Sequence, residues 1–331
     1  MGKVGTVGVE TSTDDWDAAG DGPAYPVAPF DDGATVQRAM MAPTTGQLPR
    51  SATGAVIIPA HNEAGVIART LTALAPLIEL EGIEVIVVCN GCHDATASIA
   101  RRFEGVTVLE TARGSKPEAM NLGDATATVW PRLYLDADIE IETHAVLAVF
   151  AALSEPGVLA ARAQYAYDVT GATWPVRAYY RARARIPAPA RRLWGAGGYA
   201  TNERGHRRFG TFAAVTADDS WFDEQFTADE KRVVPTTPML VRTPRDIDGL
   251  LAVLSRQRRG YLEIGISSHA GARGRELLKS VRGPMSALDA GWYAVFTLAS
   301  RRRADKARRQ TGRAWERDAS SRVQSNDEGA R

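Results

Sequence analysis

The sequence predicts an α/β fold in which an open parallel β-sheet carries helices on both faces. Short apolar runs of the buried-strand type alternate with helical patterns along residues 54–135. Short polar segments directly follow three of these runs. Strands that alternate with helices pair in parallel, so their carboxyl ends meet at one edge of the sheet, where the ligand crevice of such a fold lies.

The first half of the chain has a local reason for each of its elements. Strands are expected at 55–59, 84–89, 106–109 and 133–135. The helices between them start near polar residues that can cap a first turn, namely Asn62, Asp94 and Ser115. Ser115 also has capping-box spacing to Glu118, which strengthens the prediction of that helix.

The second half of the chain is less regular. We expect a helix from Thr143, a strand at 158–165, a loop at the glycine-rich segment 195–198, and a helix from Thr243 to about 260. Nine Arg and a single Glu lie between residues 174 and 209. This excess of charge indicates an anionic partner or, with equal weight, a solvated helix face and loop.

Composition indicates three parts and excludes some classes of partner. We divide the 331 residues into a disordered leader at 1–53, a globular domain at 54–265, and a helical extension with a basic tail at 266–331. The formal net charge of +1 argues against a nucleic acid partner. Only two cysteines occur, both in one short loop, so no disulfide framework is implied and we expect a cytoplasmic protein. No run of about 18 apolar residues occurs, so no membrane span is expected. The segment 285–309, apolar and then basic, is expected either to pack as a helix or to lie peripherally on the inner face of the membrane.

Two carboxylates follow the fourth predicted strand, at Asp136 and Asp138. In an extended chain, residues i and i+2 point to the same side, so these carboxylates are expected to converge. Hard oxygen ligands of this kind suit Mg²⁺ or Mn²⁺ when phosphate oxygens and waters complete the coordination shell. Taken alone, such a pair more often marks a turn at a strand end.

The loop Cys89-Asn90-Gly91-Cys92 has a second interpretation as a redox site. A dithiol at a helix N-terminus has a lowered thiol pKa and can exchange disulfides. A zinc site would need a second pair of ligands, which the sequence lacks. A thiol oxidoreductase is therefore the less favoured alternative.

Five segments in a fixed order resemble the inverting nucleotide-sugar glycosyltransferases of family 2, which have the GT-A fold. They are IPAHNE at 58–63, VCNGCHD at 88–94, SKPEAMN at 115–121, LDAD at 135–138 and ADD at 217–219. The resemblance covers about residues 54–262. It implies a Rossmann-like nucleotide-binding sheet with helices on both faces and a smaller acceptor-side region.

The resemblance also implies roles for individual residues. Asp138, with Asp136, would bind Mn²⁺ or Mg²⁺ between the two phosphates of the donor. Asp219, with Asp218 as the second choice, would take the proton of the acceptor hydroxyl. The residues implied at the donor nucleotide are Pro59, His61, Glu63, Asn90, Asp94, Lys116 and Asp136; those on the acceptor side are Trp194, Gly197 and Gly198; the diphosphate candidates are Arg258 and Arg259.

Several of these residues have a simpler alternative. Asp94 is first of all the natural cap of its helix. Lys116 lies near a helix N-terminus, where a phosphate binds well, but it could equally be a solvated lysine. An ordinary turn with a core tryptophan would explain Trp194 and the glycines after it.

The sequence also departs from the family pattern, and the departures shape the expected function. Many family members have two acids where this chain has Cys89 and Asn90, so the base is bound differently and uridine is only the favoured choice. The late Q-x-x-R-W signature of processive synthases is degenerate at 257–261. We expect metal-dependent inverting transfer from a nucleoside-diphosphate sugar, a UDP-sugar being favoured, to a saccharide or lipid-linked acceptor, in polysaccharide or glycolipid biosynthesis. A catalytically silent nucleotide-binding scaffold is the alternative.

Overall fold

The computed structural model describes residues 48–186, 191–265 and 270–309. Most of the predicted leader and the end of the predicted basic tail lie outside the described residues. The first strand, β1 (Ser51–Ala60), begins inside the segment predicted as leader. Residues 51–53 therefore belong to the folded domain.

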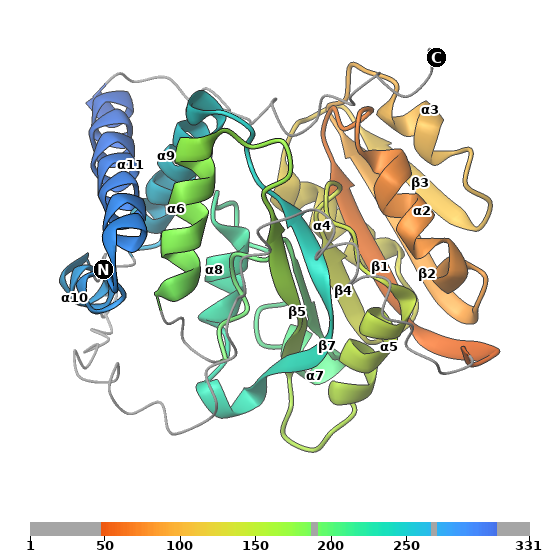
Figure 1. Ribbon diagram of the computed structural model, residues 1–331. Helices are drawn as coiled ribbons and strands as arrows, with labels where there is room; N and C mark the ends of the chain where they lie inside the picture. Colours follow the sequence, from red (N-terminus) through yellow and green to blue (C-terminus); the bar gives the residue numbers. More distant parts are fainter. Residues whose placement is uncertain (1–47, 187–190, 266–269, 310–331) are drawn as a thin grey trace, which may run out of the picture.

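A seven-stranded sheet forms the centre of the molecule, in the order β3-β2-β1-β4-β6-β5-β7 (Figure 1). Strands β3, β2, β1 and β4 pair in parallel, as predicted, whereas β6 runs antiparallel to both β4 and β5. The remaining strands are β2 (Glu81–Asn90), β3 (Val106–Thr111), β4 (Arg132–Leu135), β5 (Ala160–Asp168), β6 (Gly198–Thr201) and β7 (Lys231–Arg242).

Two of these strands were not predicted from the sequence. Strand β6 begins inside the glycine-rich segment that was expected to be a loop, so that part of the expectation was wrong. Strand β7 contains Pro235 and Pro238, which lack the N–H that a central strand needs. They are tolerated because β7 is the last strand of the sheet.

Helices cover both faces of the sheet, as expected. Alternate residues of β1 face opposite sides, so Val56 and Ile58 pack in one hydrophobic cluster and Ala55 and Ile57 in the other. The first cluster includes residues of α2 (Ile67–Ile78), α3 (Thr96–Ala100) and α5 (Thr143–Ala152). The second includes residues of α4 (Lys116–Thr126) and α8 (Asp218–Asp223). Two short helices complete this region, α7 (Glu203–His206) and the 3₁₀ helix η1 (Ala228–Glu230).

A further group of helices lies to one side of the sheet (Figure 1). It consists of α6 (Trp174–Arg185), α9 (Ile247–Glu263), α10 (Ala270–Lys279) and α11 (Pro284–Arg309). Helix α11 packs against α6 and α9 and buries Tyr293 and Phe296. The packed-helix expectation for 285–309 is therefore confirmed. Among the described helices, none combines the length and apolar character needed to cross a membrane.

The predicted helix starts differ in their outcome: α5 begins at Thr143 as expected, whereas the N-cap of α3 is Ala95 and not Asp94. Ser115 caps α4, where its side chain accepts the N–H of Glu118. Asn62 does not cap α2; it has a left-handed φ of +52°, and its side chain accepts the N–H of His93 at 2.7 Å. Helix α9 begins at Ile247 rather than at Thr243, because Asp246 provides the cap.

Candidate active site

One cleft collects the polar segments that follow β1, β2 and β4, which confirms the predicted common crevice. From these segments, the residues that line it are Pro59, His61, Glu63, Asn90, Asp136, Ala137, Asp138 and Ile139. Lys116, Gly197, Asp218 and Asp219 line the same cleft. The fold therefore brings together residues from all five predicted motifs.

Lys116 connects two of these motifs through its ammonium group. Its Nζ lies 2.6 Å from Oδ1 of Asp136 and 2.9 Å from Oδ2 of Asp218. Desolvation favours the neutral amine, but the two carboxylates outweigh it and hold the pKa of Lys116 above its usual value. Lys116 is thus a fixed cation at the start of α4 and not a solvated lysine.

The Asp136-Ala137-Asp138 segment is a turn and not the extended chain that was expected. The N–H of Ile139 donates to the carbonyl of Asp136 at 3.2 Å, which closes the turn just after β4. Both carboxylates still line the cleft. Desolvation raises the pKa of Asp136 to about 6; repulsion from Asp218 and Asp138 adds to the shift and Lys116 opposes it.

These two carboxylates fit a divalent cation only together with a ligand. In the part of the chain that the structure describes, no group of three or more His, Cys, Asp or Glu side chains could hold a metal ion. The protein would therefore supply two hard oxygen donors and leave the other positions to phosphate oxygens and waters. Mg²⁺ and Mn²⁺ are commonly bound in this way at nucleotide sites.

Gly197 lets the backbone approach Asp136 closely. Its carbonyl accepts the N–H of Asp136 at 2.7 Å, and its φ of +69° lies in the left-handed region. A Cβ here would lie 2.6 Å from Cγ1 of Ile139 and 3.2 Å from Oδ2 of Asp136. The cleft has room for glycine alone at this position.

The other two acceptor-side candidates do not line the cleft. Gly198 is a buried residue of β6 that pairs with Leu135, and a Cβ at this glycine would lie 2.8 Å from Sδ of Met239. The ring of Trp194 packs against Tyr261, with 6.1 Å between ring centroids. Both residues lie behind the lining of the cleft, and their assignment to the acceptor side stays a prediction.

Asp218 and Asp219 begin α8 and have different surroundings. Asp218 is 5% exposed, and its Oδ2 accepts the hydroxyl of Tyr199 at 2.6 Å in addition to the contact with Lys116. Asp219 is less buried and accepts the N–H groups of Gly195 at 2.7 Å and Ser220 at 2.6 Å. Desolvation and the neighbouring Asp218 raise the pKa of Asp219, and these N–H groups oppose the shift.

On the expected nucleotide side, hydrogen bonds hold the loops after β1 and β2 together. Nδ2 of Asn90 donates to the carbonyl of Ala60 at 2.9 Å, and Nδ1 of His61 donates to the carbonyl of Asn90. Asp94 is exposed and does not line the cleft. Its carboxylate accepts the N–H groups of Thr96 at 3.0 Å and Ala64 at 3.1 Å, which links the start of α3 to the loop after β1. The N-cap of α3 is Ala95, so Asp94 does not hold the predicted cap position.

The environment of the two cysteines argues against redox chemistry. Cys89 is 1% exposed, and burial followed by the neighbouring Cys92 raises the pKa of its thiol to about 12. A disulfide-exchange site needs the opposite shift, because the thiolate is the nucleophile. Sγ of Cys92 lies 3.4 Å from the carbonyl of Ala60 and 3.3 Å from the N–H of Asn62, so it joins two loops.

The structure adds cleft residues that sequence reasoning missed. Arg258 and Arg259 do not line the cleft, whereas Arg256, Gln257 and Tyr261 of the same helix do. The spacing of four between Gln257 and Tyr261 is a helical signal that could have indicated which face of α9 is turned inward. Four further residues from β5 and α6 line the cleft, namely Tyr167, Tyr179, Tyr180 and Arg183.

A comparison with protein-family models matches residues 55–214 to the model described as glycosyl transferase family 2. The chain contains a family 2 glycosyltransferase domain. The match ends before Asp218 and Asp219, so their place in the cleft is known from the tertiary structure alone. Among curated proteins, no significant match is found.

Several solved glycosyltransferases are similar to a large part of the chain. A mannosyltransferase from Pyrobaculum calidifontis, in complex with GDP-Man and Mn²⁺, is 19% identical, with a TM-score of 0.51 over 85% of this chain and 82% of that chain. TarS from S. aureus, in complex with UDP-GlcNAc, is 15% identical, with a TM-score of 0.46 over 78% and 92%. Glucosyl-3-phosphoglycerate synthase from Mycobacterium tuberculosis, in complex with UDP, is 19% identical, with a TM-score of 0.45 over 73% and 87%. The first of these likenesses agrees with the GT-A fold expected for this glycosyltransferase domain.

Proposed function

We propose that the protein is a metal-dependent inverting glycosyltransferase that moves a sugar from a nucleoside-diphosphate sugar to an acceptor hydroxyl. One observation carries this proposal: Lys116 contacts both the candidate metal ligand Asp136 and Asp218 of the candidate base motif. The residues proposed for the phosphate side and those proposed for the acceptor side therefore belong to one network of charges in one cleft. A single ligand that spans this network would contact both groups.

The residues at the turn after β4 support a role in binding the leaving group. Asp138 and Asp136 would hold Mn²⁺ or Mg²⁺, which supplies positive charge for the diphosphate as it leaves. Lys116 is a second cation at the same position and is kept charged by its two carboxylate neighbours. Phosphate oxygens would compete for it with Asp136 and Asp218.

Asp219 is the better candidate for the base because its carboxylate is less buried and its hydrogen-bond partners are neutral groups. Oδ2 of Asp218 already binds an ammonium and a hydroxyl, and that side chain is buried. Asp219 is bonded mainly by backbone N–H groups and lines the cleft. In the proposed step, the acceptor oxygen attacks the anomeric carbon from the face opposite the diphosphate. The bond from that carbon to the phosphate oxygen breaks, its electron pair leaves with the nucleoside diphosphate, and the hydroxyl proton passes to Asp219.

The donor base is tested with a panel of nucleotide sugars. UDP-sugars remain our first choice, and the Pyrobaculum mannosyltransferase, whose structure contains GDP-Man and Mn²⁺, adds GDP-sugars to the panel. Thermal unfolding is measured with each donor, with and without Mn²⁺ or Mg²⁺, because a ligand that binds only the folded state raises its melting temperature. We expect a metal-dependent increase with one base. Binding without any transfer or hydrolysis would indicate the silent scaffold instead, and no binding at all would contradict the proposal.

We also propose that α11 makes peripheral contact with an anionic membrane surface on the cytoplasmic side. Its exposed apolar residues Leu288, Val295 and Leu298 are followed at helical spacing by the exposed Arg302 and Lys306. Apolar residues that continue into basic ones fit the boundary between acyl chains and anionic headgroups.

Cosedimentation with vesicles tests this contact. We expect binding to phosphatidylglycerol vesicles and little binding to phosphatidylcholine vesicles. Replacing both Val295 and Leu298 by Ser should weaken binding, whereas the control Leu262→Ser, at an exposed leucine of α9, should not. Equal retention of all three proteins, or no binding to either vesicle, would contradict the contact.

A further inference from the structure

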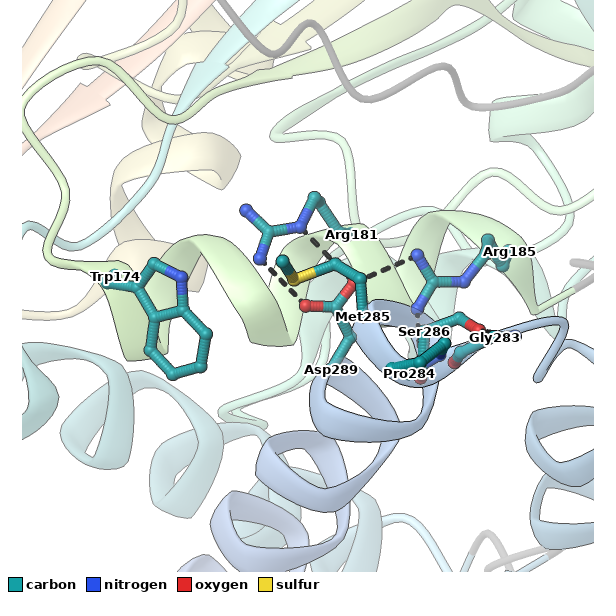
Figure 2. Close-up of a pocket in the computed structure, with 8 residues that line it drawn as sticks. All are labelled: Trp174, Arg181, Arg185, Gly283, Pro284, Met285, Ser286 and Asp289. Atoms are coloured by element: carbon teal, nitrogen blue, oxygen red, sulfur yellow. Dashed lines mark hydrogen bonds and ion pairs between the residues drawn. The ribbon is translucent and has the colours of Figure 1, made fainter.

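The arginines of α6 fall into two groups that face different neighbours. Arg181 and Arg185 are four residues apart and both bind Asp289 of α11 (Figure 2). Nη2 of Arg181 lies 2.7 Å from Oδ1, and Nη1 of Arg185 lies 3.0 Å from Oδ2 of this carboxylate, which is 1% exposed. Their charges hold α11 against α6 and are partly neutralised there.

Arg183 lies between these two residues and points the other way. Two positions along an α-helix turn a side chain by about 200°, which carries it to the opposite side. Arg183 lines the cleft, where its Nε donates to the hydroxyl of Tyr167 at 3.1 Å. Within the described ranges, it forms no ion pair with a carboxylate.

Most of the other arginines in this basic segment have local partners. The pairs are Arg191 with Asp229, Arg207 with Glu203, Arg208 with Glu230, and Arg192 with the hydroxyl of Tyr165. Arg177 donates to the carbonyl of Ala172 at 2.7 Å. Most arginines of this segment therefore form contacts within the fold, and Arg183 is the one that lines the cleft.

Arg183 belongs to a wall of the cleft that carries no acid. The lining residues from β5, α6, β7 and α9 include Arg183, Arg242 and Arg256 together with tyrosines and apolar residues, but no Asp or Glu. Nη2 of Arg242 lies 3.0 Å from Oε1 of Glu140, and the same carboxylate also forms an ion pair with Arg69. Arg256 forms no hydrogen bond or ion pair with any described residue. The Asp and Glu residues that line the cleft come from other segments, namely the loop after β1, the turn after β4 and the start of α8.

We propose that Arg183 and Arg256 bind an anionic group of the acceptor, most simply a phosphate monoester. This inference rests on the proposed transfer reaction and names the class of acceptor for it. The guanidinium group stays charged even when buried, and its fork of N–H donors matches phosphate oxygens. The tyrosine hydroxyls of the same wall supply further donors. The acceptor hydroxyl would then lie toward Asp219 while the phosphate lies against the basic wall.

A binding experiment separates this role from a role in donor binding. The protein is first saturated with Mn²⁺ and the nucleoside diphosphate that stabilises it most, and is then titrated calorimetrically with glycerol 3-phosphate or with glycerol. We expect glycerol 3-phosphate to bind in the presence of the nucleotide, and glycerol to bind far more weakly. If the nucleotide prevents the binding of glycerol 3-phosphate, the inference is wrong.

Variants then test whether Arg183 and Arg256 of this wall bind the phosphate group. Arg183→Met and Arg256→Met should each weaken the binding of glycerol 3-phosphate by about tenfold to a hundredfold, the loss expected for a hydrogen bond to a charged group. Arg204→Met, at an exposed arginine with no described partner, is the matched control and should bind as the wild type does. If Arg183→Met does not fold, Arg183→Lys should fold and still bind less tightly, because it loses the fork of donors. Wild-type affinity in the variants at both positions would overturn the assignment.

A second arm identifies the source of the phosphate. The same titration with farnesyl phosphate and farnesol in detergent tests a lipid-linked phosphate, whereas glycerol 3-phosphate tests a soluble one. Preference for the phosphorylated member of either pair supports the inference and shows which kind of acceptor is used; preference in neither pair contradicts it. Intact binding of nucleotide and Mn²⁺ in the same sample would show that the proposed function itself had not failed.

Discussion

Replacing Asp219 by Asn is the most direct test of the reaction proposed for this cleft. The amide cannot take a proton at neutral pH, so the general-base contribution is lost, which is typically about 10² to 10⁴ in rate. The structure adds a stability cost. Both carboxylate oxygens accept backbone N–H groups, so the amide NH₂ must face either Gly195 or Ser220. A donor facing a donor in a partly buried site costs about 1–3 kcal/mol of folding free energy.

The assay needs no acceptor, because water can attack the donor and must also lose a proton. We would measure the metal-dependent release of nucleoside diphosphate from the best donor, the affinity for that donor, and the melting temperature. Asp223→Asn is the control outside the cleft: its carboxylate also accepts a backbone N–H, that of Leu193 at 2.7 Å, and it does not line the cleft. Its other oxygen pairs with Lys231 at 3.0 Å, so this variant loses an ion pair as well.

We expect Asp219→Asn to retain donor binding and lose hydrolysis, and Asp223→Asn to lose stability while its folded fraction turns over normally. If Asp219→Asn hydrolyses the donor at a rate within a few-fold of wild type, Asp219 is not the base. If Asp218→Asn alone shows the expected loss with donor binding intact, Asp218 takes the role.

Three further predictions concern the same cleft. Asp138→Ala should abolish the Mn²⁺-dependent increase in melting temperature with nucleotide, and an unchanged increase would remove its metal role. Gly197→Ala should destabilise the protein by about 2–5 kcal/mol in urea unfolding, because left-handed strain of about 1–2 kcal/mol adds to overpacking of about 1–3 kcal/mol. Gly210→Ala has a similar φ of +66° but nothing within 4 Å of its Cβ, so it should show only the strain, and equal losses in the two variants would refute the packing argument. Asp219 must be deprotonated to act as the base, and its surroundings raise its pKa. Turnover should therefore fall as the pH decreases through a value above about 3.9, the ordinary pKa of an Asp side chain. A flat profile down to pH 4 would contradict this assignment.

The helix starts show where local sequence was sufficient and where it was not. Ser115 caps α4 through a contact three residues away, which depends on the local chain alone. Asn62 has the same type of side chain for capping but is used to bind the N–H of His93 on the neighbouring loop. A cap and a bridge between loops have the same local signature, so only the packed fold distinguishes them.

The arginines show a similar limit for charge. Their number indicated an anionic partner or, with equal weight, a solvated helix face, but Asp289, which neutralises two of them, lies far along the chain on α11. The pairing therefore depends on how α6 and α11 pack. The arginine left on the cleft side could be identified only after these helices were placed.

The sequence by itself determined the parallel half of the sheet, its carboxyl-edge crevice and the polar residues that follow β1, β2 and β4, because apolar period and strand-end position are local properties. The antiparallel strand β6, the carbonyl of Gly197 at Asp136, and the bridge from Lys116 to Asp218 were decided only by the tertiary structure. Each joins residues that are distant in the chain, and their contact depends on the order of strands in the sheet. Local propensity does not encode that order.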